Sequence, residues 1–235
     1  MLRLWVLVSL SLPEGDILVV VREALDVSII DASEEHVPFI AWVQLTAFRS
    51  HLSKGMWDFF VGGSEEDALR FLEAFATTET KHWGSYQGFI IAKVDGTSAA
   101  AMTGYFEADS SFERGLAEAC RTVGMTQSDV NEGWKRAGTI GLVGTKHAPG
   151  AWITENVATK PEFRRRGLVD KLLAEMLERG RSRAATIADI GVFIGNDNAQ
   201  RAYEKAGYEV VEEKLHPDFE AVYRCPGVRQ LRREL

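Results

Sequence analysis

The strongest constraint on this chain is a strand joined to an amphipathic helix by a turn that contains three arginines. Trp152–Thr159 predicts the strand, and Lys160-Pro161 predicts the turn. From about Arg166 to Arg183, apolar residues recur every three to four positions, which predicts a helix with one buried face. Strands and helices alternate from here on and are mixed earlier, so we expect an α/β or α+β fold around one sheet.

The junction between this strand and this helix has the composition of a phosphate site. A helix N-terminus leaves backbone N–H groups without intrahelical partners, and its dipole favours an anion there. Arg164, Arg165 and Arg166 add positive charge and forked donors, while Gly167 lets a ligand approach the backbone closely. The segment therefore predicts a site for a phosphate or pyrophosphate. Neither the glycine-lysine pattern of a P-loop nor the glycine pattern of a dinucleotide-binding turn occurs in the sequence.

The overall charge argues against some classes of partner. The chain has 235 residues, of which 34 are acidic and 27 are lysine or arginine, and its formal net charge is -7. A chain this acidic has no general attraction to nucleic acid or to an anionic membrane, and we expect it to bind neither. No apolar run reaches the ~18 residues that a membrane span needs. Cys120 and Cys225 are far apart and lack metal-ligand spacing, which indicates reduced thiols and a cytoplasmic protein.

The N-terminal residues allow two interpretations. Met1–Leu12 holds one arginine and a short apolar stretch, as a weak signal peptide does, but no clean cleavage site follows it. Pro13–Asp16 is a good turn sequence and Ile17–Val21 is a second apolar run, which favours a β-hairpin extension over residues 1–24. Such an apolar hairpin can pair with a second copy across a symmetric interface, so we expect a homodimer.

The rest of the chain predicts alternating short elements. Asp95-Gly96 predicts a hairpin turn, and Ser64-Glu-Glu-Asp67 is a capping-box pattern whose helix we expect to run to about Trp83. Gly55–Gly63 is typical of a loop, and residues 109–150 are a helical insert that is long enough to form a lid. We also expect strands at 27–30, 88–94, 99–106 and 186–194, and closing strands at 208–213 and 221–224. Helices are expected at 37–48, 112–122 and 128–137, with a further short helix that ends at Gly207. Residues 138–150 are expected to form a glycine-rich loop.

Two blocks of this sequence resemble the GNAT superfamily of acetyltransferases. Pro161–Leu168 resembles the acetyl-CoA motif [QR]-x-x-G-x-[GA], and Asn196–Tyr208 resembles the pattern N-x-x-A-x-x-x-Y-x-K-x-G-[FY]. The blocks have the superfamily's order and usual separation, and the close resemblance covers about residues 152–213. One departure is Val169, which stands where the motif has a small residue. The resemblance implies a single domain over residues 1–235, with a mixed, mostly antiparallel sheet flanked by helices.

The resemblance also implies how this chain binds acetyl-CoA. Backbone amides across Arg164–Val169 would hold the pyrophosphate. The pantetheine arm would pair with the free edge of a strand that splays from its neighbour, as an added β-strand does. Asn196 would lie near the cofactor at the end of the next strand. The implied contacts are Val157, Ala158, Thr159, Arg164, Arg165, Arg166, Gly167, Leu168, Val169 and Asn196.

Direct attack of an amine on the thioester is the chemistry that the resemblance implies. Tyr203 matches the motif tyrosine that protonates the departing thiolate, with packing in the core as its alternative. Glu155 is the candidate general base, because it is a carboxylate in an otherwise apolar strand, two residues before Val157 on the same face; the alternative is a glutamate that reaches solvent. The N–H of Val157 would polarise the carbonyl. His82, ending a predicted helix, and His147, in the glycine-rich loop, are rival bases, and no histidine has metal-ligand spacing, so we expect no metal.

The cofactor motif alone leaves three functions open. The first is an N-acyltransferase for a small amine or an amino acid, which predicts a closed, aromatic pocket. The second is a catalytically silent CoA-binding sensor or interaction module, and the third is a protein acetyltransferase for lysine or an N-terminus, which predicts an open groove. Trp57, Phe59, Phe60 and Trp83 are candidates for an aromatic pocket wall, with ordinary packing as their alternative.

Overall fold

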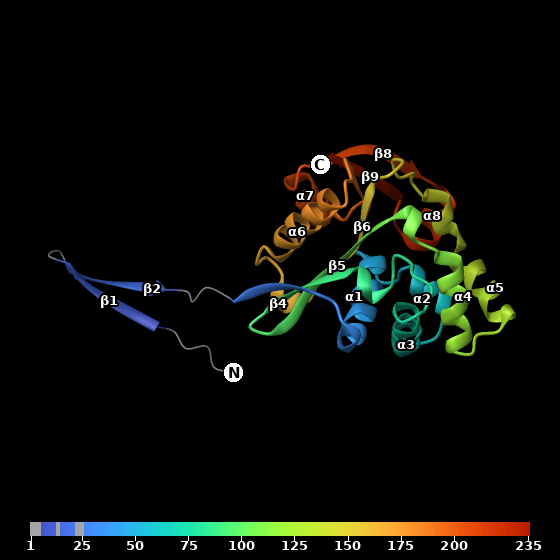
Figure 1. Ribbon diagram of the computed structural model, residues 1–235, viewed down its shortest axis with the longest axis horizontal. Helices are drawn as coiled ribbons and strands as arrows, with labels where there is room; N and C mark the ends of the chain where they lie inside the picture. Colours follow the sequence, from blue (N-terminus) through green and yellow to red (C-terminus); the bar gives the residue numbers. More distant parts are fainter. Residues whose placement is uncertain (1–5, 13–14, 22–25) are drawn as a thin grey trace.

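The computed structural model describes residues 6–12, 15–21 and 26–235 (Figure 1). Strands β1 (Val6–Leu12) and β2 (Gly15–Val21) pair antiparallel in a separate two-stranded sheet. They form the hairpin that the two apolar runs at the N-terminus predict. Residues 13 and 14 of the predicted turn lie outside the described residues, as do residues 1–5 and 22–25.

The other strands form one seven-stranded sheet with the order β3-β4-β5-β6-β7-β9-β8. Every neighbouring pair is antiparallel except β6 and β7, which run parallel. A mixed, mostly antiparallel sheet is therefore confirmed. The strands are β3 (Val27–Asp31), β4 (Phe89–Val94), β5 (Thr97–Phe106), β6 (Trp152–Thr159), β7 (Ile187–Phe193), β8 (Glu209–Leu215) and β9 (Gly227–Glu234).

Helices cover both faces of this sheet (Figure 1). Helix α6 packs on β4, β5 and β6 from one side, with α7 beside it. Helix α1 packs on β5 and β6 from the other side, and α2 to α5 extend that layer. The helices are α1 (Val37–Arg49), α2 (Met56–Val61), α3 (Glu65–Ala76), α4 (Phe112–Thr122), α5 (Gln127–Ala137), α6 (Leu168–Ser182), α7 (Asp197–Lys205) and α8 (Pro217–Tyr223).

The predicted helical insert packs into a second apolar core. One cluster of buried residues lies between the sheet and α6, and includes Trp152 and Leu172. A separate cluster joins α1, α2 and α3 to α4 and α5 of the insert, around the fully buried Trp57, Phe60 and Phe71. Because burial of aromatic area is a large stabilising contribution, the insert is anchored to the rest of the chain.

The capping box at Ser64 is confirmed. Ser64 Oγ accepts from the Asp67 N–H at 3.2 Å, and Asp67 Oδ2 accepts from the Ser64 N–H at 3.0 Å. Helix α3 ends at Ala76, so the prediction that it runs to Trp83 is wrong. Thr77 Oγ1 donates to the Glu73 carbonyl at 2.9 Å, and hydroxyl groups that bond to the backbone favour a helix end.

Two further predictions of local structure are wrong. The segment predicted as a loop at 55–63 contains α2, whose start is stabilised by a hydrogen bond of 2.8 Å from the Gly55 N–H to Asp58 Oδ2. The segment predicted as a closing strand at 221–224 lies at the end of α8, where Pro217 occupies the first turn and His216 Nδ1 accepts from the Asp218 N–H at 3.2 Å. The closing strand is β9.

Candidate functional site

Strands β6 and β7 separate after three residue pairs. Their parallel pairing joins Trp152–Thr154 to Ala188–Ile190 and stops there. A β-bulge shifts the register of β6 against β5, and Asn156 within it has a positive φ of 55°, a conformation that asparagine tolerates better than most residues. A bulge bends its strand. As a result, neither Val157–Thr159 nor residues 191–193 have a ladder partner in the other strand.

The same bulge places Glu155 and Val157 on opposite faces of the sheet. Glu155 pairs with Thr103, and Ala158 pairs with Ala101 on the face covered by α1. Val157 instead packs against the apolar cluster beneath α6. The prediction that Glu155 and Val157 share a face is therefore wrong, because the extra residue of a bulge reverses the alternation of side chains.

A cavity of about 270 Å³ opens where the two strands separate. Glu155, Asn156 and Val157 of β6 line it, as does Tyr203 of α7. His147, from the glycine-rich loop before β6, also lines this cavity. The structure thus brings the two candidate catalytic side chains into one space, which we name the central cavity.

The surroundings of Glu155 favour a basic carboxylate. Burial raises the pKa of the Glu155 carboxyl, and this outweighs the opposite effects of the His147 charge and of a polar interaction with Tyr105. A carboxylate whose pKa is raised toward neutrality is a better proton acceptor near neutral pH. Burial and the negative charge of Glu155 also raise the pKa of Tyr105, so that phenol keeps its proton.

Tyr203 both packs in the protein core and lines the central cavity. Its side chain is 5% exposed and its ring packs near Tyr208, with ring centroids 6.5 Å apart. The residue also lines the central cavity. Burial raises the pKa of Tyr203, so the phenol stays protonated at neutral pH and can donate a proton or a hydrogen bond.

His147 lies beside a buried ion pair. Asp189 of β7 is fully buried and accepts two hydrogen bonds from Arg232, at 2.7 and 2.9 Å. Burial lowers the pKa of His147, but the nearby carboxylates of Asp189, Glu155 and Glu107 outweigh burial and raise it above the ordinary value. His147 therefore stays protonated to a higher pH than a free histidine does.

Asn156 is a polar residue to which the sequence analysis assigned no role. Its side chain is 5% exposed, and neither Oδ1 nor Nδ2 has a hydrogen-bond partner among the described residues. Leaving a buried amide without partners is unfavourable. Because Asn156 lines the central cavity, its amide is available to a polar group of a ligand there.

A larger cavity of about 1090 Å³ lies at the start of α6. Gly167 precedes this helix with a φ of 72°, and a Cβ at this position would meet no heavy atom within 4 Å. Arg164 and Arg165 are exposed, and Arg166 Nη2 donates to the Glu162 carbonyl at 2.8 Å. An open backbone beside three guanidinium groups fits a pyrophosphate. Residues 161–170 line this phosphate cavity, together with Thr159, Asn198, Ala202 and Lys205.

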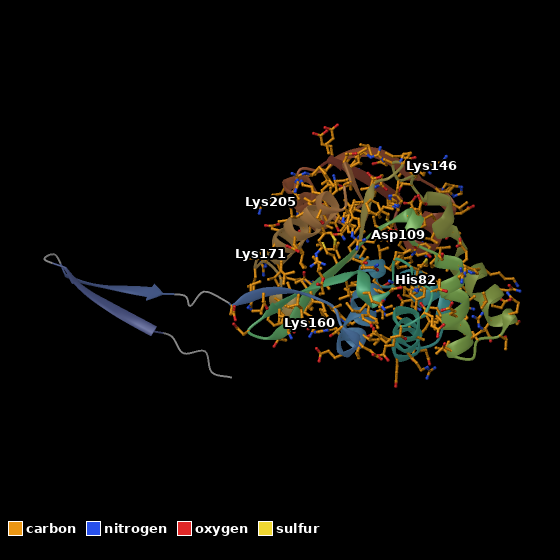
Figure 2. All side chains as sticks on the ribbon, viewed as in Figure 1. His82, Asp109, Lys146, Lys160, Lys171 and Lys205 are labelled. Carbon is orange, nitrogen blue, oxygen red and sulfur yellow. The ribbon has the colours of Figure 1, made fainter. Side chains whose placement is uncertain are left out.

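Helix α7 adds a positive charge to the phosphate cavity. Lys205 lines the cavity and also pairs with Asp170 of α6. Figure 2 shows Lys205 and Lys171 together on the side of the molecule formed by α6 and α7, away from His82. The motif of the sequence contains Lys205, but its closeness to the turn after β6 is visible only in the folded chain.

Val169 and Asn196 both make contacts within the protein. Val169 packs against the apolar cluster beneath α6 while it lines the phosphate cavity, so the core accommodates its larger side chain. Asn196 caps α7 by accepting from the Ala199 N–H at 3.2 Å, and its Nδ2 donates to Ser50 Oγ at 2.7 Å. Asn196 lines neither cavity, so its contact with a cofactor stays a prediction.

His82 has a structural environment. Its Nε2 lies 2.9 Å from Thr78 Oγ1, its Nδ1 accepts from the Gly84 N–H at 3.0 Å, and its ring stacks on Phe75 at 3.9 Å. Burial lowers the pKa of His82 to about 4. His82 lines neither the central cavity nor the phosphate cavity. Both of its ring nitrogens make contacts within the protein.

Packing explains three of the four aromatic residues that were candidates for a pocket wall. Trp57 and Phe60 are fully buried, and Phe59 packs edge-on against Tyr223 with ring centroids 5.1 Å apart. Trp83 instead lines a third cavity, which also reaches Glu155.

Over residues 26–235, no group of three or more His, Cys, Asp or Glu side chains is placed to hold a metal ion. No helix within the described part of the chain has the length and apolarity to cross a membrane.

The model of the acetyltransferase (GNAT) family matches residues 56–208, which is more than half of the chain. This chain belongs to the acetyltransferase (GNAT) family. The match begins at Met56, so it includes α2 to α5, which the two motifs do not cover. This GNAT protein is accordingly an acyltransferase, and acetyl-CoA is its cosubstrate. The phosphate cavity and the free edge of β6 fit that molecule.

Solved acetyltransferase structures share the fold of this GNAT protein. One, described as an acetyltransferase, aligns with a TM-score of 0.65 and 19% identity over 88% of this chain and 98% of its own. An N-acetyltransferase from Staphylococcus aureus Mu50 aligns with a TM-score of 0.62 and 19% identity, over 88% and 100%. An agmatine N-acetyltransferase aligns with a TM-score of 0.52 and 15% identity, over 89% and 100%. No curated protein sequence matches the chain. At these identities the likeness shows the fold alone.

Proposed function

We propose that this protein transfers the acetyl group of acetyl-CoA to the amine of a small molecule by direct attack on the thioester. The observation that carries the proposal is that Glu155 and Tyr203 line one cavity at the point where β6 and β7 separate. A half-buried carboxylate and a buried phenol in one cavity would supply the proton acceptor and the proton donor that this reaction needs.

The cosubstrate would be held by two kinds of contact. The pyrophosphate would bind the backbone N–H groups at the start of α6 and the guanidinium groups of Arg164, Arg165 and Arg166. The pantetheine arm would pair with the free edge of Val157–Thr159, as an added strand. This arrangement would direct the thioester into the central cavity, where the Asn156 amide or the Val157 N–H would polarise its carbonyl.

The chemical step moves two protons. The amine nitrogen forms a bond to the carbonyl carbon, and the bond between that carbon and sulfur breaks. Glu155 takes the proton that the nitrogen loses, and Tyr203 gives its proton to the departing thiolate. Solvent then returns a proton from Glu155 to Tyr203. The products are an N-acetyl amine and CoA.

The two other functions make different demands on the molecule. A silent CoA-binding module needs neither Glu155 nor Tyr203 near the thioester, and a protein acetyltransferase needs an open groove beside them. The small-molecule reaction is favoured because both side chains line a cavity of about 270 Å³, close to the lower size range of small-ligand pockets. We also propose a homodimer and a cytoplasmic location; a monomeric mass by light scattering at micromolar concentration would contradict the dimer.

The first experiment is thermal unfolding with and without acetyl-CoA, with ATP and NAD as controls. A ligand at about 100 times its dissociation constant adds about 2.7 kcal/mol of stability, which raises the midpoint measurably. We expect a rise with acetyl-CoA alone. No rise, in protein shown to lack co-purified CoA, would remove both the enzyme and the CoA-binding module.

Substitution of Tyr203 then separates the enzyme from the silent module. Tyr203→Phe should lower turnover about ten- to a thousandfold, the range expected for a lost general acid, while acetyl-CoA raises the unfolding midpoint as before. Tyr208→Phe is a matched control, because Tyr208 is equally buried but does not line the central cavity. Equal turnover in the Tyr203 variant and the wild type would remove Tyr203 from the mechanism.

A further inference from the structure

A third cavity, which we name the aromatic cavity, leads to Glu155. Its volume is about 320 Å³, and it shares Phe48, Ile140 and Glu155 with the central cavity. The two cavities therefore meet at the candidate base. A molecule in the aromatic cavity can present one end to Glu155 while its remainder lies outside the central cavity.

The walls of the aromatic cavity are apolar. Met56, Phe112, Trp83 and Trp134 line it with the two shared apolar residues, and the other lining residues except Glu155 are glycines. Glu155 is the only charged or polar side chain in this lining. Such a wall favours an apolar ligand body, because each buried Å² of apolar area contributes roughly 25 cal/mol.

The aromatic rings support one another, so the cavity is formed before a ligand enters. Trp83 stacks on Phe112 with ring centroids 5.6 Å apart and planes 14° apart, and Phe48 lies 5.5 Å from Trp83. Behind them, the fully buried Trp57 packs against Trp83 at 5.9 Å. A site whose rings are already ordered loses little conformational freedom on binding.

The charges around these cavities limit what else the ligand can carry. The lining of the aromatic cavity contains no lysine, arginine or histidine, so a carboxylate or phosphate on a ligand body there would be buried without a cationic partner. Glu155 is the single carboxylate in both linings. A second ammonium group on the acceptor would therefore lack the partner that the first one has.

We infer that the acceptor is a monoamine: a primary amine on an apolar, ring-sized body, without a carboxylate or a second positive charge. The inference rests on the proposed function and names its substrate class. The body occupies the aromatic cavity, and the amine lies at Glu155. Aromatic faces near the ammonium attract the cation, which releases one proton to solvent before the neutral amine attacks the thioester.

The test is the rate of CoA release with three amines that differ in one respect each. We expect kcat/KM for 2-phenylethylamine to exceed that for phenylalanine, which adds a carboxylate, and that for 1,4-diaminobutane, which replaces the ring by a second amine, by about 100-fold. Faster release with phenylalanine or with the diamine would overturn the inference and leave the proposed function standing. Release with none of many amines, despite acetyl-CoA binding, would count against the proposed function itself.

A pair of neighbouring variants tests the location. Gly141 lines the aromatic cavity and a Cβ there would meet no heavy atom within 4 Å, so Gly141→Phe can add a ring at this wall without a clash at Cβ. It should raise the KM for 2-phenylethylamine at least about tenfold and leave the acetyl-CoA midpoint shift unchanged. Leu142→Phe is the control, because Leu142 is 45% exposed on the same turn and lines neither cavity. Equal KM values in the two variants would place the amine elsewhere.

Discussion

His147 Nδ1 lies 3.6 Å from Oδ2 of Asp189, a carboxylate that is wholly enclosed by the fold. The Ala148 N–H, next in the chain, donates to the same oxygen at 2.8 Å. Asp189 therefore holds the loop before β6 against β7, and its charge opposes the effect of burial on the pKa of His147. A loop that the sequence describes only as glycine-rich thus brings an imidazole to the central cavity.

Asp189→Asn should destabilise the protein at pH 7 and somewhat less at pH 3, where only the first part of the stabilisation by the Asp189 charge has been lost. The hydrogen bonds from Arg232, the charge of His147 and the Ala148 N–H hold the pKa of Asp189 below its ordinary value, although burial raises it. Its stabilising charge is thus present above about pH 4 and is lost as the pH falls further. We expect a loss of about 2 kcal/mol at pH 7, measured by urea unfolding. Asp218→Asn, at an exposed carboxylate, is the control, and an equal loss at both pH values would contradict the prediction.

Glu155→Gln should remove the acidic limb of the pH–rate profile. The raised pKa of Glu155 means that the base becomes available only as the pH rises past that value, so wild-type kcat/KM should increase with pH through a midpoint above 4.5, the ordinary value. The variant should lose about 100-fold in kcat/KM at neutral pH and show a flat profile there. Glu107→Gln removes an exposed carboxylate that lines neither cavity and should keep the limb. A limb that persists in the Glu155 variant would assign the base to another group.

Gly167→Ala should weaken acetyl-CoA binding more than it weakens the fold. Gly167 has a φ of 72° and Gly124 has a φ of 78°, and a Cβ at either would meet no heavy atom within 4 Å. Each alanine should therefore cost about 1 kcal/mol of stability through backbone strain alone. Only the Gly167 variant should raise the dissociation constant of acetyl-CoA, about tenfold, because its methyl group enters the phosphate cavity. Isothermal titration calorimetry on both variants would show equal affinities if the pyrophosphate binds elsewhere.

His82 should make the protein sensitive to mild acid. Burial lowers its pKa to about 4, against 6.5 for an ordinary histidine, so between these values the unfolded chain binds a proton that the folded chain does not. Stability should fall by about 3 kcal/mol as the pH drops from 6.5 to 4. His82→Asn should be less stable at pH 7 but should lose less over this window. His51→Asn, at an exposed histidine, should keep the wild-type slope, and a His82 variant with that same slope would contradict the assignment.

Local patterns predicted residues 152–213 closely. Strand β6 spans the predicted residues, and α6 begins two residues after the predicted start, since Gly167 precedes it in a left-handed conformation. The patterns were less informative for 55–63 and 221–224, where short helices occupy a predicted loop and a predicted strand. These helices are short, and their starts are stabilised by local hydrogen bonds between Gly55 and Asp58 and between His216 and Asp218. Periodicity is weak over six or seven residues.

The sequence by itself determined the family, a candidate phosphate-binding turn and two candidate catalytic residues, because each of these depends on residue types at short, fixed spacing. Only the tertiary structure decided which face Glu155 occupies, since one residue in the bulge at Asn156 reverses the alternation of β6. It also decided that Trp57 and Phe60 fill a core while Trp83 and Trp134 line a cavity beside Glu155. Burial of an aromatic ring is set by contacts between helices that are distant in the chain, and no local pattern contains those contacts.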